Sequence, residues 1–90
     1  MSYNDKTITS ATGASQMLAA SNLNRRSLLI KNGASSAGVN LRGTTAAIGG
    51  ASTITLSPYE ALFLDGADCP LGDVTVITSA AAYVAALEGV

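Results

Sequence analysis

The 90-residue chain has no histidine, no tryptophan and a single cysteine, Cys69. Without histidine it lacks the usual general base of neutral pH, so neither a Ser-His nor a Cys-His nucleophile pair can form. One thiol cannot form a disulfide within the chain, and a structural zinc site needs four ligands, most often from cysteine and histidine. The sequence therefore predicts a protein that is not an enzyme and that holds neither a metal nor a cofactor.

Charged and aromatic residues are also scarce. Charged residues make up 12% of the chain, about half of the ~25% usual in soluble domains. The net charge of −1 provides no field that would attract nucleic acid, and aromatics at 4% are too few for base stacking. No window approaches the ~20 apolar residues of a membrane span, and the N-terminus lacks the basic-then-apolar pattern of a signal peptide. We therefore expect no nucleic-acid partner and no membrane insertion.

One loop gathers most residues that might suggest a reactive or metal site. Asp65, Asp68 and Asp73 lie in it, but their spacing does not match a calcium-binding loop. Cys69, in the same loop, has no neighbour in sequence that would lower its pKa. We interpret these residues as turn-forming aspartates and a half-buried thiol.

The small size of the chain favours assembly. A domain of this length buries only about 60–65% of its unfolded surface, so its core alone is marginal. Small domains usually add disulfides, a metal or oligomerisation, and only oligomerisation is left here. A surface of small, weakly polar side chains also suits contact with neighbours. We therefore expect a homo-oligomer, with a trimer favoured, that binds other proteins.

Short segments that alternate apolar and polar residues recur along the chain and predict strands. The expected strands are Arg26–Asn32, Val39–Arg42, Ser52–Ser57, Glu60–Leu64 and Val74–Thr78. Ser15–Ala20 is either a short strand or one helical turn. The inward positions of these strands predict a core of Leu28, Ile30, Val39, Leu41, Ile54, Leu56, Phe63, Val74 and Val76.

The last segment, Ser79–Gly89, is ambiguous. Its alanines favour a helix, and Gly89 could cap it. Against this, Tyr83, Ala85 and Leu87 alternate with the residues between them, as in a strand. We prefer the strand, because Val74–Thr78 needs an antiparallel partner.

Six or seven short strands with turn residues between them indicate an all-β fold, a small antiparallel β-sandwich or barrel. Residues 15–90 are expected to form this domain. Residues 1–14 contain little apolar material beyond Ile8, so they are expected to form an extended N-terminal arm, with a short strand at Thr7–Thr9. Such an arm would be mobile alone and would reach across to another subunit or to the larger assembly that the protein joins.

Residues for partner contacts are chosen from exposed aromatic, basic and arm positions. Arg25 and Arg26 form the one adjacent basic pair, expected to flank a strand and pair with a carboxylate in this chain or in a neighbouring subunit. The candidate partner-binding residues are Tyr3, Ile8, Arg25, Arg26, Arg42 and Tyr59.

Several stretches resemble a known group of proteins. They are SQMLAASNLNRRSLLIKN, then VNLRG, STITLSPYEALFLDG and DVTVITSAAAYVAALEG, which together cover about residues 15–89. They resemble small virion-associated β proteins of tailed bacteriophages, whose opening pattern xxVLAxNxxRxxLxIxN is matched most distinctively at Asn24–Asn32. At Pro58–Glu60 the group usually has Pro-Gly, and a turn with positive φ depends on that glycine.

The resemblance implies a structural protein of the virion, made in the host cytoplasm, that decorates or cements the capsid. Its partner would be the major capsid protein or another virion protein. An alternative is a minor structural protein of the tail or fibre, or a receptor- or glycan-binding module there. A glycan-binding module should show clustered aromatics or a calcium site, and the sequence shows neither. A host-directed inhibitor of a cytoplasmic enzyme is a third reading.

Overall fold

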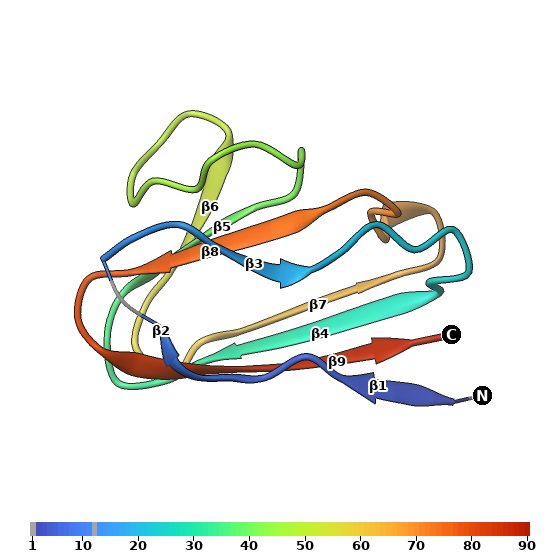
Figure 1. Ribbon diagram of the computed structural model, residues 1–90, viewed down its shortest axis with the longest axis horizontal. Helices are drawn as coiled ribbons and strands as arrows, with labels where there is room; N and C mark the ends of the chain where they lie inside the picture. Colours follow the sequence, from blue (N-terminus) through green and yellow to red (C-terminus); the bar gives the residue numbers. More distant parts are fainter. Residues whose placement is uncertain (1, 12) are drawn as a thin grey trace.

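The structure, a computed structural model, describes residues 2–11 and 13–90, and almost all of its regular structure is strand. A five-stranded antiparallel sheet contains β1 (Tyr3–Asp5), β2 (Ile8–Ala11), β4 (Ser27–Asn32), β7 (Ala61–Asp65) and β9 (Ala82–Gly89). A four-stranded antiparallel sheet contains β3 (Gln16–Ala19), β5 (Ala37–Asn40), β6 (Thr53–Leu56) and β8 (Val74–Thr78), and the 3-10 turn η1 (Gly66–Asp68) follows β7. The expected all-β class is confirmed (Figure 1).

The strand order brings the two ends of the chain together. In the larger sheet the order is β1-β9-β4-β7, with β2 also paired to β9; in the smaller sheet it is β3-β8-β5-β6. From β2 onward the chain crosses between the sheets at every step except β5 to β6. Residues near both termini therefore lie side by side at one end of the molecule (Figure 1), where Ser2 and Val90 exchange backbone hydrogen bonds.

One hydrophobic core lies between the two sheets. Strands β4 and β9 contribute Leu28, Ile30, Val84 and Ala86, and the smaller sheet contributes Leu18, Ala19, Ala37, Val39, Leu56, Val74 and Val76. In β4, β8 and β9 the core residues alternate with more exposed ones, because successive side chains of a strand point to opposite faces. Strand β5 is buried at all four positions. Six of the nine expected core residues are buried, and Leu41 packs against the core while half-buried.

Two of the expected core residues are not buried. Ile54 is 41% exposed and Phe63 is 59% exposed. Phe63 pairs with Leu29 on β4, so it lies on the outer face of the larger sheet while its neighbours Leu62 and Leu64 face inward and are half-buried. Periodicity identifies which residues share a face but does not say which face is covered, and for β7 the prediction chose the wrong one.

The last segment is a strand, as preferred. Strand β9 pairs with β1 and β2 on one side and with β4 on the other. Its alanines are accommodated because Val84 and Ala86 face the core at alternate positions. Strand β8 has the expected bounds, and Ser15–Ala20 contains a strand rather than a helical turn.

The N-terminal residues are extended, as expected, but they do not leave the domain. Strands β1 and β2 both pair with β9 of the same chain, and Ala11 is fully buried in the core. The prediction of an arm that reaches another subunit is therefore wrong for residues 2–11; residues 1 and 12 lie outside the described residues. The low apolar content misled the prediction, because backbone pairing to β9 does not depend on apolar side chains.

Candidate protein-binding face

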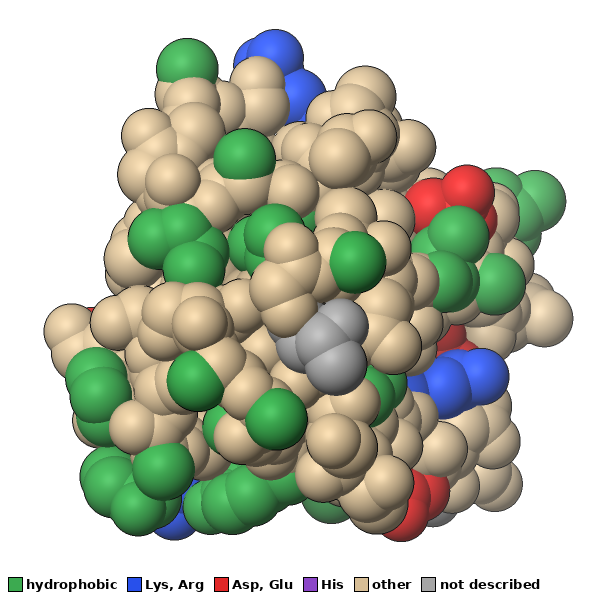
Figure 2. Space-filling view, turned by 60° about the vertical axis from the view of Figure 1, so that its left-hand side comes forward, with side chains coloured by type: hydrophobic (Ala, Val, Ile, Leu, Met, Phe, Trp, Pro, Cys, Tyr) green, Lys and Arg blue, Asp and Glu red, His purple; other side chains and the backbone are tan. Residues whose placement is uncertain are grey.

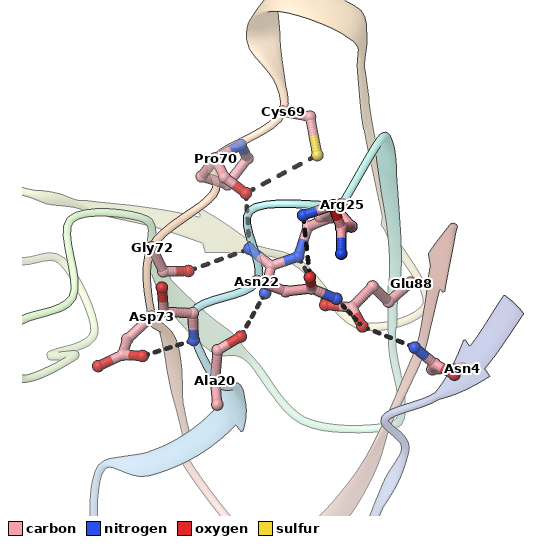
Figure 3. Close-up of polar contacts among 11 residues, drawn as sticks. Asn4, Ala20, Asn22, Arg25, Cys69, Pro70, Gly72, Asp73 and Glu88 are labelled. Carbon is pink, nitrogen blue, oxygen red and sulfur yellow. Dashed lines mark hydrogen bonds and ion pairs between the residues drawn. The ribbon is translucent and has the colours of Figure 1, made fainter. Parts of the chain in front are cut away.

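A buried ion pair occupies the end of the molecule where the termini meet (Figure 3). Arg25, just before β4, donates from Nε to Glu88 Oε2 at 2.7 Å, and the exposed fractions of the two residues are 3% and 1%. The remaining guanidinium nitrogens donate to the carbonyls of Ala20, Pro70 and Gly72 at 2.6–3.0 Å. The arginine thus ties the β3–β4 loop and the β7–β8 loop to strand β9.

The other carboxylate oxygen of Glu88 is also satisfied. Oε1 accepts hydrogen bonds from Asn4 Nδ2 at 3.0 Å and from Asn22 Nδ2 at 3.2 Å. Desolvation on burial opposes ionisation of Glu88, but the hydrogen bonds from Asn4, Arg25 and Asn22, together with the charge of Arg25, outweigh it. The pKa of Glu88 therefore lies below its ordinary value, and the carboxylate is charged at neutral pH.

This arrangement decides the role of Arg25. The expectation that it pairs with a carboxylate is confirmed within the chain. Its selection as a partner-binding residue stays a prediction: its side chain is buried, although the residue is among those that line the hollow described next. The hydrogen bonds described for the pair all go to groups of this chain, so the pair joins segments of the fold to one another. One signal pointed to the partner: Glu88 continues the inward-facing positions Val84 and Ala86 of β9. A carboxylate at such a position needs a buried counter-charge.

The outer face of the five-stranded sheet is apolar and exposed. Leu29 on β4 pairs with Leu87 on β9 and with Phe63 on β7, so the three form a row across neighbouring strands. Their exposed fractions are 38%, 42% and 59%. Tyr3 and Tyr83 lie on the same face at its two ends. We call these five residues the apolar face.

One end of the apolar face is hollowed. Tyr3, Ser27 and Asp65 belong to one transverse row, next to the Leu87–Leu29–Phe63 row. Ser27 is small and nearly buried, so a hollow of about 810 Å³ opens between the larger side chains, lined also by Arg26. On the face of the molecule that Figure 2 shows, charged side chains are few and lie mainly near the outline of the molecule. An apolar depression with a basic and an acidic side chain at its margin is suited to a protein surface.

The outer face of the smaller sheet is different, because the chain covers it. The segment between β5 and β6 folds back over this face, where Asn40 donates to Thr44 Oγ1 at 2.8 Å and Thr75 Oγ1 donates to the Thr44 carbonyl at 2.6 Å. A Cβ on Gly38 would lie 2.8 Å from the Thr53 Cγ2 and 3.2 Å from the Ala47 oxygen. Glycine is therefore required for this close approach, and the larger sheet keeps the open face.

The structure brings only some of the sequence-selected residues together. Tyr3 and Arg26 line the hollow. Ile8 is half-buried against the core, and Arg42 is exposed near β6, away from the hollow. Tyr59 is 62% exposed in the turn between β6 and β7. Sequence reasoning missed Leu29, Phe63 and Leu87 as surface residues. The unbroken apolar run Leu28–Leu29–Ile30 was the available signal that both faces of β4 carry apolar side chains.

The loop with the aspartates and the thiol shows ordinary structural contacts. Asp73 Oδ1 accepts a hydrogen bond from the Ser21 backbone N–H at 2.7 Å. Burial raises the pKa of Cys69, which outweighs the effect of the nearby Arg25 charge, so the thiolate is disfavoured. Within residues 2–11 and 13–90, no group of three or more histidine, cysteine, aspartate or glutamate side chains is placed to hold a metal ion.

Two further results bear on identity. In the described part of the chain, no helix has the length and apolar character needed to cross a bilayer. Comparison of the chain with protein-family models, with curated proteins and with solved structures finds no match.

Proposed function

We propose that this chain is a structural protein of a tailed-bacteriophage virion that attaches to the capsid through its apolar face. The observation that carries the proposal is the exposed row of Leu87, Leu29 and Phe63 across three paired strands. Burying apolar surface contributes roughly 25 cal/mol per Å², so a fixed protein partner would stabilise this row. The virion setting comes from the resemblance described above, and the two-sheet, sandwich-like fold is compatible with it.

The polar groups around the apolar face suit a protein partner better than a small charged ligand. Arg26 and Asp65 line the hollow with opposite charges, and the charge of Arg25, which also lines it, is paired with Glu88. The hollow therefore has little net charge for an ionic ligand to recognise. Interfaces between proteins commonly combine an apolar centre with a polar rim that sets the orientation. Tyr3 adds an aromatic side chain of the kind enriched at such interfaces.

The location on the particle distinguishes the two virion readings. A capsid-decorating protein should be present in many copies, in a fixed ratio to the major capsid protein, whereas a tail or fibre component should be present in few. Quantifying this chain against the major capsid protein in purified particles measures that ratio. A low copy number, or absence from particles, contradicts capsid decoration.

The face itself can be tested by charge substitution. Leu87→Lys places a cation in the apolar row and should reduce binding of the purified protein to undecorated particles at least about tenfold, the equivalent of ~1.4 kcal/mol. Met17→Lys is the matched control, since Met17 is 51% exposed on the outer side of the smaller sheet. Equal binding by both variants, with both folded by circular dichroism, would contradict attachment through the apolar face.

A further inference from the structure

Strand β7 lies at an open edge of the five-stranded sheet. Among the described residues it pairs only with β4, and the register from Ser27↔Asp65 to Lys31↔Ala61 is continuous. Asn32 donates to the Glu60 carbonyl and Gly66 donates to the Arg26 carbonyl, so the even-numbered residues of this segment face β4. By the alternation of an antiparallel ladder, the N–H and C=O of Ala61 and Phe63 and the N–H of Asp65 point to the open edge.

The other sheet edges in the described part of the chain are interrupted. On the β9 side the edge is divided between β1 and β2, and the register shifts between Ile8 and Ala11. Strand β3 also has a register shift. The loop before strand β6 folds against that strand, with Gly49 N–H donating to Thr55 Oγ1 at 3.2 Å. Such features are the usual protection against edge pairing, and β7 has none of them.

The sequence of β7 is nearly symmetric about Phe63. Its residues are Ala61, Leu62, Phe63, Leu64 and Asp65. Leu62 and Leu64 face inward and are half-buried, whereas Phe63 stands on the outer face at 59% exposure. Two such strands aligned antiparallel on Phe63 would place leucine opposite leucine on the inner side and phenylalanine opposite phenylalanine on the outer side.

We propose that two copies of this chain associate through antiparallel pairing of their β7 strands, centred on Phe63. The two Phe63 residues exchange N–H···O=C hydrogen bonds across a two-fold axis, and the Ala61 carbonyl accepts from the Asp65 N–H of the other copy. The aromatic pair and the leucine pairs lose water on association, and cross-strand pairs of this kind stabilise sheets. This gives the oligomeric contact expected from the composition, with two-fold symmetry instead of the three-fold symmetry of a trimer.

Charge also favours a second copy of this chain as the partner of the β7 edge. In this register Asp65 faces the small Ala61 of the other copy, and Lys31 stands beside that Ala61 on β4. Lys31 and the Asp65 of the other copy are then two strand spacings apart, about 10 Å between backbones. A lysine side chain can cover most of this distance over an alanine. Neither Lys31 nor Asp65 has a salt bridge among the described residues of its own chain.

Cysteine cross-linking tests both the pairing and its register. In a Cys69→Ser background, Phe63→Cys should form a disulfide-linked dimer under mild oxidation, because opposed residues lie about 5.5 Å apart between Cα atoms, within disulfide range. Asp65→Cys in the same background is the matched control. It lies on the same face of the same strand, but the two copies of residue 65 would be separated by about 13 Å along the strands. The expected cross-linking rate is at least about tenfold higher for Phe63→Cys.

A second pair of variants separates this association from the proposed capsid contact. Ala61→Pro removes an edge-facing N–H without changing the apolar face, and should weaken dimerisation at least about tenfold in sedimentation equilibrium. Leu87→Lys should leave the dimer intact. Equal cross-linking at positions 63 and 65, a cross-link that survives Ala61→Pro, or a Phe63→Cys chain that stays monomeric would each overturn the β7 pairing. If Leu87→Lys loses particle binding but still dimerises, the result supports the capsid contact and leaves the β7 pairing unaffected.

Discussion

Two distant parts of the chain converge on Glu88: β1 through Asn4, and the β3–β4 loop through Asn22 and Arg25. The Arg25–Glu88 pair is buried, so removing one partner leaves an uncompensated charge away from water. Such a loss is far more costly than the loss of a surface ion pair, which contributes ~1 kcal/mol or less.

Glu88→Gln should therefore lower the free energy of unfolding by about 3–5 kcal/mol. Asp68→Asn, which neutralises an exposed carboxylate of η1, is the control and should change it by less than about 0.5 kcal/mol. Urea denaturation monitored by circular dichroism measures both. If both variants lower the free energy of unfolding by the same small amount, the buried pair does not hold the loops in place.

The pH dependence of stability follows from the lowered pKa of Glu88. The unfolded chain takes up a proton near the ordinary value of 4.5, whereas folded Glu88 remains charged to lower pH. Its contribution is therefore complete above pH 4.5 and is lost as the pH falls through the lower folded pKa. Melting temperatures measured between pH 7 and pH 3 should fall less steeply for Glu88→Gln than for the natural chain. If the melting temperatures of the two chains fall equally with pH, a lowered pKa of Glu88 in the folded chain is contradicted.

Tyr59 adopts a backbone conformation that usually belongs to glycine. Its φ is 64°, at the third position of the Ser57–Glu60 turn, and Glu60 N–H donates to the Ser57 carbonyl at 3.0 Å. Proline at the second position and positive φ at the third are typical of a type II turn. The turn that glycine forms in the resembling proteins is thus formed here by tyrosine.

Tyr59→Gly should raise the free energy of unfolding by up to about 1 kcal/mol, because a non-glycine residue at positive φ is strained by ~1–2 kcal/mol and glycine loses part of this gain through chain entropy. Tyr59→Ala is the control, since it removes the ring and keeps the strain. If the alanine variant is as stable as the glycine variant in thermal denaturation, the effect comes from the ring and not from the backbone.

At the scale of elements, strand β9 organises the larger sheet. It pairs with β1 and β2 on one side and β4 on the other. Without the two N-terminal strands, β9 would be an exposed edge strand of the sheet. Ala11 is buried and Ile8 packs against the core. The N-terminal residues therefore act as part of the domain, in contrast to the arm expected from their composition.

Deleting residues 2–11 should lower the free energy of unfolding by about 3 kcal/mol or more. The deletion removes the Asn4 hydrogen bond to the buried Glu88 carboxylate, worth roughly 1.5–3 kcal/mol, and uncovers the apolar surface beneath Ile8 and Ala11. Denaturant unfolding of the deleted and full-length chains measures the difference. A deleted chain of unchanged stability would instead support a detachable arm.

At the scale of the whole molecule, one core lies between the two sheets, while the apolar face is exposed and is proposed above to contact a partner. Ile30 is fully buried and Phe63 is 59% exposed, although both were predicted to lie in the core. A domain of this size has only about 5–15 kcal/mol of total stability, so a single core substitution is a large change.

Ile30→Ala should lower the free energy of unfolding by about 2–5 kcal/mol, the usual cost of a large-to-small core substitution. Phe63→Ala should lower it by less than about 1 kcal/mol, since much of the ring is already in water. Chemical denaturation of both variants, at a concentration where the natural chain is monomeric, gives the comparison. A larger loss for Phe63→Ala would place Phe63 in the core after all.

Local pattern was enough for the fold class, for most strands, and for the inward residues of β4, β5 and β8, because side-chain direction alternates with a period of two and apolar residues mark the covered side. It was not enough for β7, since Leu62, Phe63 and Leu64 are all apolar and only the position of the second sheet decides which face is covered. The pairing of Arg25 with Glu88 and the docking of residues 2–11 on β9 likewise join segments more than 60 residues apart in sequence. Such contacts depend on the sum of the packing and hydrogen-bonding choices of the whole chain, and no short stretch of sequence contains that information.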